Sequence, residues 1–151
     1  MNGKSKLELE WSHYGGDSKE PRAFLDIRIN NQSLFRIFKE RGFDVISCLG
    51  WGPASEQAKA VGRLLLKEPS DLPANRRSLY ICHIDGDIGC GAVTIRIEKG
   101  DDTITWKSFG FENNYEEQSL DMDTLSDIGP FEFERNHYES IVQGALEAGS
   151  V

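Results

Sequence analysis

Apolar and polar residues alternate along five short stretches of the chain, which is the pattern of a β-strand with one buried face. These stretches are 7–11, 25–29, 93–97, 104–108 and 131–134. A sixth stretch, 79–84, is apolar on both faces, as expected of a strand in the middle of a sheet. Gly100, Asp101 and Asp102 form a connection short enough for a tight hairpin turn, and the first two stretches are placed to pair as a hairpin as well.

Three other segments follow the spacing of an amphipathic helix. Residues 32–41 precede Gly42, a typical C-terminal stop, and a second helix is expected from Pro53 to about Lys67. The third begins near Asn136, where Glu139 completes an approximate capping box. Strands in runs with separate helices indicate an α+β fold. We predict one domain, 1–151, with a mostly antiparallel sheet of five or six strands and two or three helices packed on one face.

Composition supports a single folded domain. The chain has 151 residues, of which 38% are hydrophobic, enough to bury a core. The longest apolar runs are three or four residues, and the N-terminal segment lacks an apolar stretch, so we expect neither a membrane span nor a signal peptide. Three cysteines, Cys48, Cys82 and Cys90, are an odd number at uneven spacing, a pattern that is not typical of a disulfide framework. They fit a reducing compartment, which predicts a cytoplasmic protein.

Negative charge is concentrated in the last third of the chain. Residues 99–151 contain twelve Asp or Glu against three Lys or Arg, a net charge of −9, whereas residues 1–98 carry a net charge of +1. A one-sided field of this kind attracts basic partners. It argues against nucleic acid as a ligand, because binding phosphates requires Lys and Arg.

Aromatic residues are interleaved with carboxylates over residues 109–117, and the acidic stretch 112–127 is predicted from the sequence to be a long loop. Aromatic anchors among charges are common in protein-binding surfaces. A solvated loop whose aromatic residues cover the edge of the core would give the same pattern. The predicted contact residues are Phe111, Glu112, Tyr115, Glu116, Glu117, Asp121 and Asp123.

A second candidate site is the segment 82–91, which contains two thiols, an imidazole and two carboxylates. As a metal site it would use Cys82, His83, Asp85, Asp87 and Cys90, with zinc as the metal. However, Cys-x-x-Cys is absent, and strand alternation sends adjacent residues to opposite faces. A twelve-residue calcium loop would need a closing Glu where Arg96 stands. The simpler interpretation is a glycine-rich hairpin with buried cysteines and no bound metal.

Catalytic signatures are weaker still. The sequence does not bring a cysteine and a histidine together as a nucleophile pair, and it lacks the Gly-x-Ser-x-Gly elbow of serine hydrolases. Two carboxylates among twenty-five acidic residues do not by themselves indicate a glycosidase. We therefore predict no catalytic residues, and an enzyme is the less favoured class.

Three glycine-rich motifs carry a resemblance to a family of small uncharacterised bacterial proteins. They lie at 47–52, 86–92 and 110–115, and the similarity extends over roughly residues 22–146. Some members of that family have Cys-x-x-Cys before the second motif, where this chain has Asp85 in place of the second cysteine. In its small size, acidity and α+β character the chain also resembles immunity proteins of bacterial polymorphic toxin systems.

The leading hypothesis is a cytoplasmic immunity-type inhibitor that occludes a basic toxin domain through its acidic C-terminal third. Electrostatic attraction would speed association, and apolar anchors would supply affinity. The rival hypothesis is a small metal-binding protein or metal-dependent enzyme using the segment between Cys82 and Cys90. A third hypothesis is a scaffold subunit of a larger enzyme, which would bind through the same surface and differ only in its partner.

Overall fold

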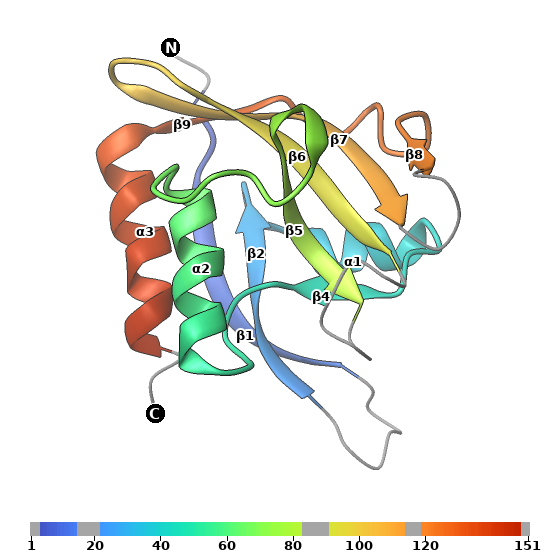
Figure 1. Ribbon diagram of the computed structural model, residues 1–151, viewed down its shortest axis with the longest axis horizontal. Helices are drawn as coiled ribbons and strands as arrows, with labels where there is room; N and C mark the ends of the chain where they lie inside the picture. The colour runs from blue at the N-terminus through green and yellow to red at the C-terminus, as the bar shows by residue number, and fades with distance from the viewer. Residues whose placement is uncertain (1–3, 15–21, 83–90, 114–118, 149–151) are drawn as a thin grey trace.

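The computed structural model describes residues 4–14, 22–82, 91–113 and 119–148. Its main sheet has six antiparallel strands in the order β4-β5-β6-β7-β8, and β9 also pairs with β7. The strands are β4 (Val45–Ser47), β5 (Arg76–Cys82), β6 (Ala92–Lys99), β7 (Thr103–Asn113), β8 (Ser119–Asp121) and β9 (Phe131–Glu134). Strand β7 pairs with β9 near its start and with β8 at its end, so it spans the molecule (Figure 1). The predicted α+β fold with a mostly antiparallel sheet is confirmed.

A second, three-stranded sheet is formed by the N-terminal residues. It contains β1 (Leu7–Tyr14), β2 (Arg22–Ile29) and the two-residue β3 (Gln32–Ser33). The predicted hairpin is present, in a register that pairs Leu7 with Ile29. The alternation pattern could not show that these strands form a separate sheet, because strands of both sheets alternate with the same period of two residues. One backbone hydrogen bond, from Leu25 N to Leu49 O at 2.9 Å, connects β2 to the segment after β4.

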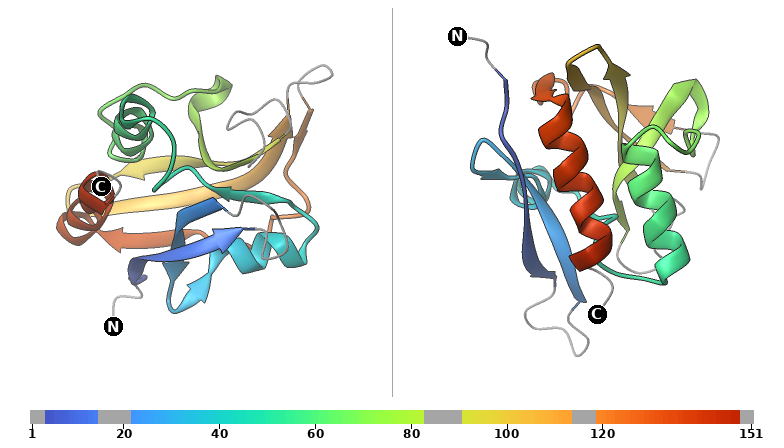
Figure 2. Two further views of the ribbon diagram at one scale, coloured as in Figure 1. Left: turned by 90° about the horizontal axis from the view of Figure 1, so that it is seen from below. Right: turned by 90° about the vertical axis from the view of Figure 1, so that its left-hand side faces the viewer.

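The described ranges contain three α-helices, which are α1 (Leu34–Glu40), α2 (Ala54–Leu64) and α3 (Arg135–Ala148). Helix α1 starts later than the expected 32–41 because the two residues before it pair with β2, and the Ser33 side chain then caps it by accepting from Arg36 N at 3.1 Å. Helix α3 runs between the β1–β2 hairpin and α2 (Figure 2). No helix in the described ranges is long and apolar enough to cross a membrane.

An aromatic cluster ties these helices to the sheet. The rings of Trp106 and Phe133 meet edge to face with centroids 5.1 Å apart, and Tyr138 on α3 stacks on Phe133 at 5.5 Å. Trp106 Nε1 donates to the Tyr138 hydroxyl at 3.0 Å, which in turn donates to Leu64 O at the end of α2 at 2.6 Å. The three aromatic rings are essentially inaccessible to solvent. Their buried polar atoms are satisfied by one chain of hydrogen bonds through both helices.

A β-bulge changes which residues of β7 face the core. Thr94 on β6 pairs with Gly110 on β7, and Arg96 pairs with Lys107. Strand β7 therefore has one extra residue between these two pairs. Ser108 takes it up with a φ of 58°. Before the bulge Trp106 is buried, and after it Phe109 is buried, so the inward positions shift from even to odd numbers. Gly110 and Glu112 consequently lie on the face opposite Phe109.

Asp26 lies inside the fold, although the sequence pattern puts it on the polar side of its strand. It is 3% exposed, and its carboxylate accepts hydrogen bonds from the Tyr80 hydroxyl at 2.6 Å, from Phe35 N at 3.1 Å and from the Ser33 hydroxyl. The Tyr80 hydroxyl also accepts from Ile27 N at 2.9 Å. One carboxylate thus joins β2, the start of α1 and the main sheet.

Burial of weak acids in the core predicts a loss of stability at alkaline pH. Burial raises the pKa of the Cys48 thiol from 9.0 to about 12 and also raises the pKa values of the Tyr80 and Tyr138 hydroxyls. These groups are neutral when protonated, so the unfolded chain ionises first. The stability that they contribute is complete below about pH 9 and is lost as the pH rises from there towards the folded-state values.

Urea unfolding at pH 7, 9 and 10 measures this effect. We expect the free energy of unfolding to fall between pH 9 and pH 10, with Cys48 contributing at most about 1.4 kcal/mol per pH unit. In Cys48→Ala the fall should be shallower than in the parent chain. An equal slope in both proteins would contradict the assignment to Cys48.

Candidate protein-binding surface

The predicted contact residues occupy three different kinds of position. Tyr115, Glu116 and Glu117 lie outside the described residues. Phe111 is partly buried and stacks on Phe43 with ring centroids 4.6 Å apart. Its ring also explains a glycine of the second sequence motif, because a Cβ at Gly91 would overlap it. Phe111 therefore packs largely within the fold, and the sequence pattern overstates its availability as an external anchor.

Glu112 requires a correction as well, because its carboxylate is buried in an ion pair. Its side chain and that of Arg76 are each 4% exposed, and Arg76 Nε lies 3.1 Å from Glu112 Oε2. The Thr94 hydroxyl donates to the same oxygen at 2.6 Å. Burial lowers the pKa of the Arg76 guanidinium, and Glu112 opposes that shift. Glu112 adds no charge to the surface, and we remove it from the contact set.

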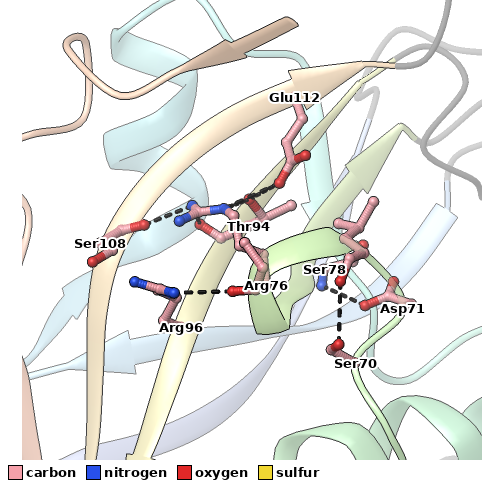
Figure 3. Close-up of polar contacts among 10 residues, drawn as sticks. Ser70, Asp71, Arg76, Ser78, Thr94, Arg96, Ser108 and Glu112 are labelled. Carbon is pink, nitrogen blue, oxygen red and sulfur yellow. Dashed lines mark hydrogen bonds and ion pairs between the residues drawn. The ribbon is translucent and has the colours of Figure 1, made fainter. Parts of the chain in front are cut away.

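Arg76 holds the end of the sheet together. It reaches from β5 across β6 to β7 (Figure 3). Its Nη2 donates to Thr94 O on β6 at 2.8 Å and to Ser108 O on β7 at 2.6 Å. The second bond fixes the carbonyl of the bulge residue. Gly110 lets the guanidinium pass, because a Cβ there would lie 3.0 Å from Arg76 Nη2. The same Cβ would lie 2.7 Å from the sulfur of Met122, so Met122 and Arg76 pack on the same side of β7.

Two exposed apolar side chains lie above this buried ion pair. Leu120 is 43% exposed and Met122 is 36% exposed, and both approach Gly110. Leu120 belongs to β8, the last strand in the order of the main sheet. Large apolar side chains at a sheet edge are a common feature of interaction sites. We call Leu120, Asp121, Met122 and Asp123 the β8 surface.

The two aspartates of the β8 surface are held in a defined turn. Asp121 accepts hydrogen bonds from Asp123 N at 2.9 Å, from Thr124 N at 3.2 Å and from the Thr124 hydroxyl at 2.7 Å. These bonds, chiefly that from the Thr124 hydroxyl, lower the pKa of Asp121, so its carboxylate stays ionised at neutral pH. Asp123 is exposed. The turn therefore presents two negative charges on either side of Met122.

Several other acidic residues of the last third are matched inside the chain. Asp127 forms a two-point ion pair with Arg41, at 2.5 and 2.7 Å, and the hydrogen bonds from Arg41 lower its pKa. Glu139 pairs with Arg135 at 3.2 Å. Glu134 accepts from the first backbone N–H groups of α3 and caps that helix. The net charge of −9 thus overstates the unmatched charge of this region.

Two further acidic residues lie far from the β8 surface. Asp101 and Asp102 lie in the turn between β6 and β7, at the opposite end of β7 from β8 (Figure 1). At roughly 3.3 Å per residue the length of β7 separates them from the β8 surface by about 30 Å. The two acidic groups therefore lie at opposite ends of β7, and we take β8 alone as the candidate binding surface.

The metal-site hypothesis falls on residues that the structure does not describe. His83, Asp85, Asp87 and Cys90 lie outside the described ranges, and of Cys82 only the backbone, at the end of β5, is described. Within the described ranges no group of three or more His, Cys, Asp or Glu is placed to hold a metal ion. The zinc hypothesis stays a prediction.

A wider hollow of about 870 Å³ lies between the β1–β2 hairpin and α1. The charged residues that line it are Arg28, Arg36, Lys39, Glu10, Asp26 and Glu40. Three cations face three carboxylates, so the hollow does not favour a ligand of either charge. The carboxylate of Asp26 is already engaged by three donors. We therefore assign it no ligand.

Sequence reasoning missed Leu120 and Met122, although the signal was present. Leu120, Asp121, Met122 and Asp123 alternate apolar and polar residues over four positions. That is the period of a strand, but the surrounding acidic residues indicated a loop. Strand β4 was missed for a similar reason, because three buried residues are too few to show a period.

No protein-family model, curated protein or solved structure matches this chain. The resemblances to small bacterial proteins and to immunity proteins therefore stay predictions.

Proposed function

We propose that this chain is an immunity-type binding protein that holds a basic toxin domain through the β8 surface. The observation that carries the proposal is the pair of exposed apolar residues, Leu120 and Met122, next to the ionised Asp121 and the exposed Asp123. Protein interfaces commonly combine a desolvated apolar centre with a charged rim. The β8 surface has both elements within four consecutive residues.

The buried ion pair favours a rigid platform for such an interface. Arg76 and Glu112 lie directly beneath, and Arg76 fixes the backbone of β6 and β7 through carbonyl oxygens of Thr94 and Ser108. A surface that is ordered before binding loses less entropy when the partner arrives. Inhibition would then occur by occlusion, with Lys or Arg of the toxin domain engaging Asp121 and Asp123 while apolar side chains meet Leu120 and Met122.

The charge of the β8 surface can be tested with a matched pair of variants. In Asp121→Asn/Asp123→Asn the association rate with a basic partner should fall by about tenfold at low salt, because electrostatic steering is lost. The slope of the rate against ionic strength should flatten. Surface plasmon resonance at several salt concentrations measures both. The partner would be the product of the adjacent gene or the stoichiometric protein captured from the source cell.

The control is Asp101→Asn/Asp102→Asn, which removes the same charge at the other end of β7. We expect it to keep most of the parental association rate. Equal slowing by both variants would show that net charge matters and the β8 surface does not. If neither variant changes the association rate, the proposal fails. Stoichiometric zinc in protein purified without chelator, lost in Cys90→Ser, would favour the metal-binding alternative.

A further inference from the structure

A small pocket opens beside the β8 surface, between β7 and the segment that leads to β9. Its volume is about 180 Å³, and it is lined by Ser108, Phe109, Met122, Ser126, Ile128 and Pro130. Met122 belongs both to this pocket and to the β8 surface. The pocket therefore continues the apolar part of that surface into the molecule.

The walls of the pocket are held by the fold. Arg76 fixes the carbonyl of Ser108, the bulge residue, at 2.6 Å. On the other side, Gly129 has a φ of 76° and lies against the Phe109 ring, since a Cβ there would be 3.1 Å from that ring. Ser126 N and its hydroxyl both donate to Asp123 O, at 3.2 and 2.9 Å. The pocket is thus formed before any partner binds.

The size and lining of the pocket favour one kind of occupant. Pockets for small molecules usually have volumes of roughly 300–1,000 Å³. A pocket of 180 Å³ walled by Phe109, Met122 and Ile128 suits a single apolar side chain. Interface anchors of this type fill a pocket near the centre of the contact.

The negative charge next to the pocket indicates which residues of the partner would flank the apolar anchor. Asp121 and Asp123 flank Met122 in sequence, and the nearby Asp127 is neutralised by Arg41. The two residues on either side of Met122, which lines the pocket, therefore carry negative charges that no cation matches within the described ranges. Side chains with positive charge on either side of the anchor would meet them.

We infer that this pocket receives a leucine-sized apolar side chain of the protein partner, flanked in that partner by Lys or Arg. This inference rests on the proposed function and specifies the recognition element of the partner. It places the anchor between Phe109 and Met122, with the basic residues over Asp121 and Asp123.

The probe is the capped tripeptide acetyl-Lys-Leu-Lys-amide, titrated into ¹⁵N-labelled full-length protein and followed by heteronuclear NMR. We expect saturable shifts at the amides of Ser108, Phe109 and residues 126–129. The affinity should be about tenfold higher than that of acetyl-Lys-Ala-Lys-amide, because the leucine side chain buries three more carbon atoms. Acetyl-Glu-Leu-Glu-amide should bind more weakly than the lysine peptide.

Two variants test the location. Ser126→Trp should fill the pocket and abolish the leucine preference, whereas Ser140→Trp, at an exposed position on α3, should keep it. Met122→Ala removes a wall without adding bulk and should reduce the affinity for the leucine peptide about threefold or more. Circular dichroism confirms that each variant is folded.

Equal affinity for the leucine and alanine peptides would overturn the inference, and so would shifts that do not saturate. If the pocket variants leave partner binding unchanged while Asp121→Asn/Asp123→Asn slows association, only the anchor assignment fails. If all of these variants bind the partner like the parent, the proposed function fails with it.

Discussion

Replacing Arg76 by methionine is expected to lower the free energy of unfolding by about 3–5 kcal/mol, the usual cost of leaving one member of a buried ion pair without its partner. The Glu112 carboxylate would keep only the Thr94 hydroxyl among the donors that the structure describes. Thr94 O and Ser108 O would also lose the guanidinium donor. Urea unfolding followed by circular dichroism at pH 7 measures the loss.

The two members of this pair should behave asymmetrically. In Glu112→Gln the guanidinium keeps two carbonyl acceptors, so we expect a smaller loss, about 2 kcal/mol. The double variant Arg76→Met/Glu112→Leu removes both charges and should be more stable than Arg76→Met alone. A loss below about 1 kcal/mol in Arg76→Met would contradict the assignment of Arg76 as a central stabilising residue. Such a result would also weaken the case for a rigid platform under the β8 surface.

Asp26→Ala is expected to cost about 3–4 kcal/mol, since a buried carboxylate with three donors is removed. The Tyr80 hydroxyl, the Ser33 hydroxyl and Phe35 N would each lose an acceptor inside the protein. Because Phe35 N is at the first turn of α1, that helix should also lose order. Chemical denaturation gives the free energy, and hydrogen exchange of residues 34–40 tests the effect on the helix.

Substitutions around Asp26 separate its roles. Asp26→Asn keeps the shape and one acceptor oxygen, so its loss should be intermediate, about 1–2 kcal/mol. Ser33→Ala removes the cap of α1 and should cost about 1 kcal/mol. If Asp26→Ala is as stable as the parent chain, the hydrogen bonds of Asp26 that join β2, α1 and the main sheet do not contribute to the free energy of unfolding.

The elements that sequence reasoning located best are those with a long and regular period. The hairpin of β6 and β7 follows from alternating residues on both sides of a short polar turn, Gly100 to Asp102. Helix α2 follows from its apolar stripe and from Pro53, which precedes it. In each case the pattern is local, because the period of the backbone itself decides which side chains face the core.

Short elements escaped the same reasoning. Strands β4 and β8 have three residues each, so they contain less than two periods of alternation. They are strands because a long neighbour offers hydrogen bonds, β5 for β4 and β7 for β8. Their existence depends on tertiary pairing, and this is why the exposed residues of the β8 surface were not recognised from the sequence.

Local sequence patterns were enough to predict the α+β class, the positions of most strands and helices, and the excess of acid in the last third. They did not determine which acidic residues are unmatched, because that depends on partners far away in the chain. Glu112 is neutralised by Arg76 and Asp127 by Arg41, pairs separated by 36 and 86 residues. The pairing of β5, β6 and β7 brings Arg76 to Glu112, whereas Arg41, at the end of α1, meets the turn residue Asp127 through the packing of the fold. Asp121 and Asp123 are unmatched because the fold brings no cation to either of them within the described residues.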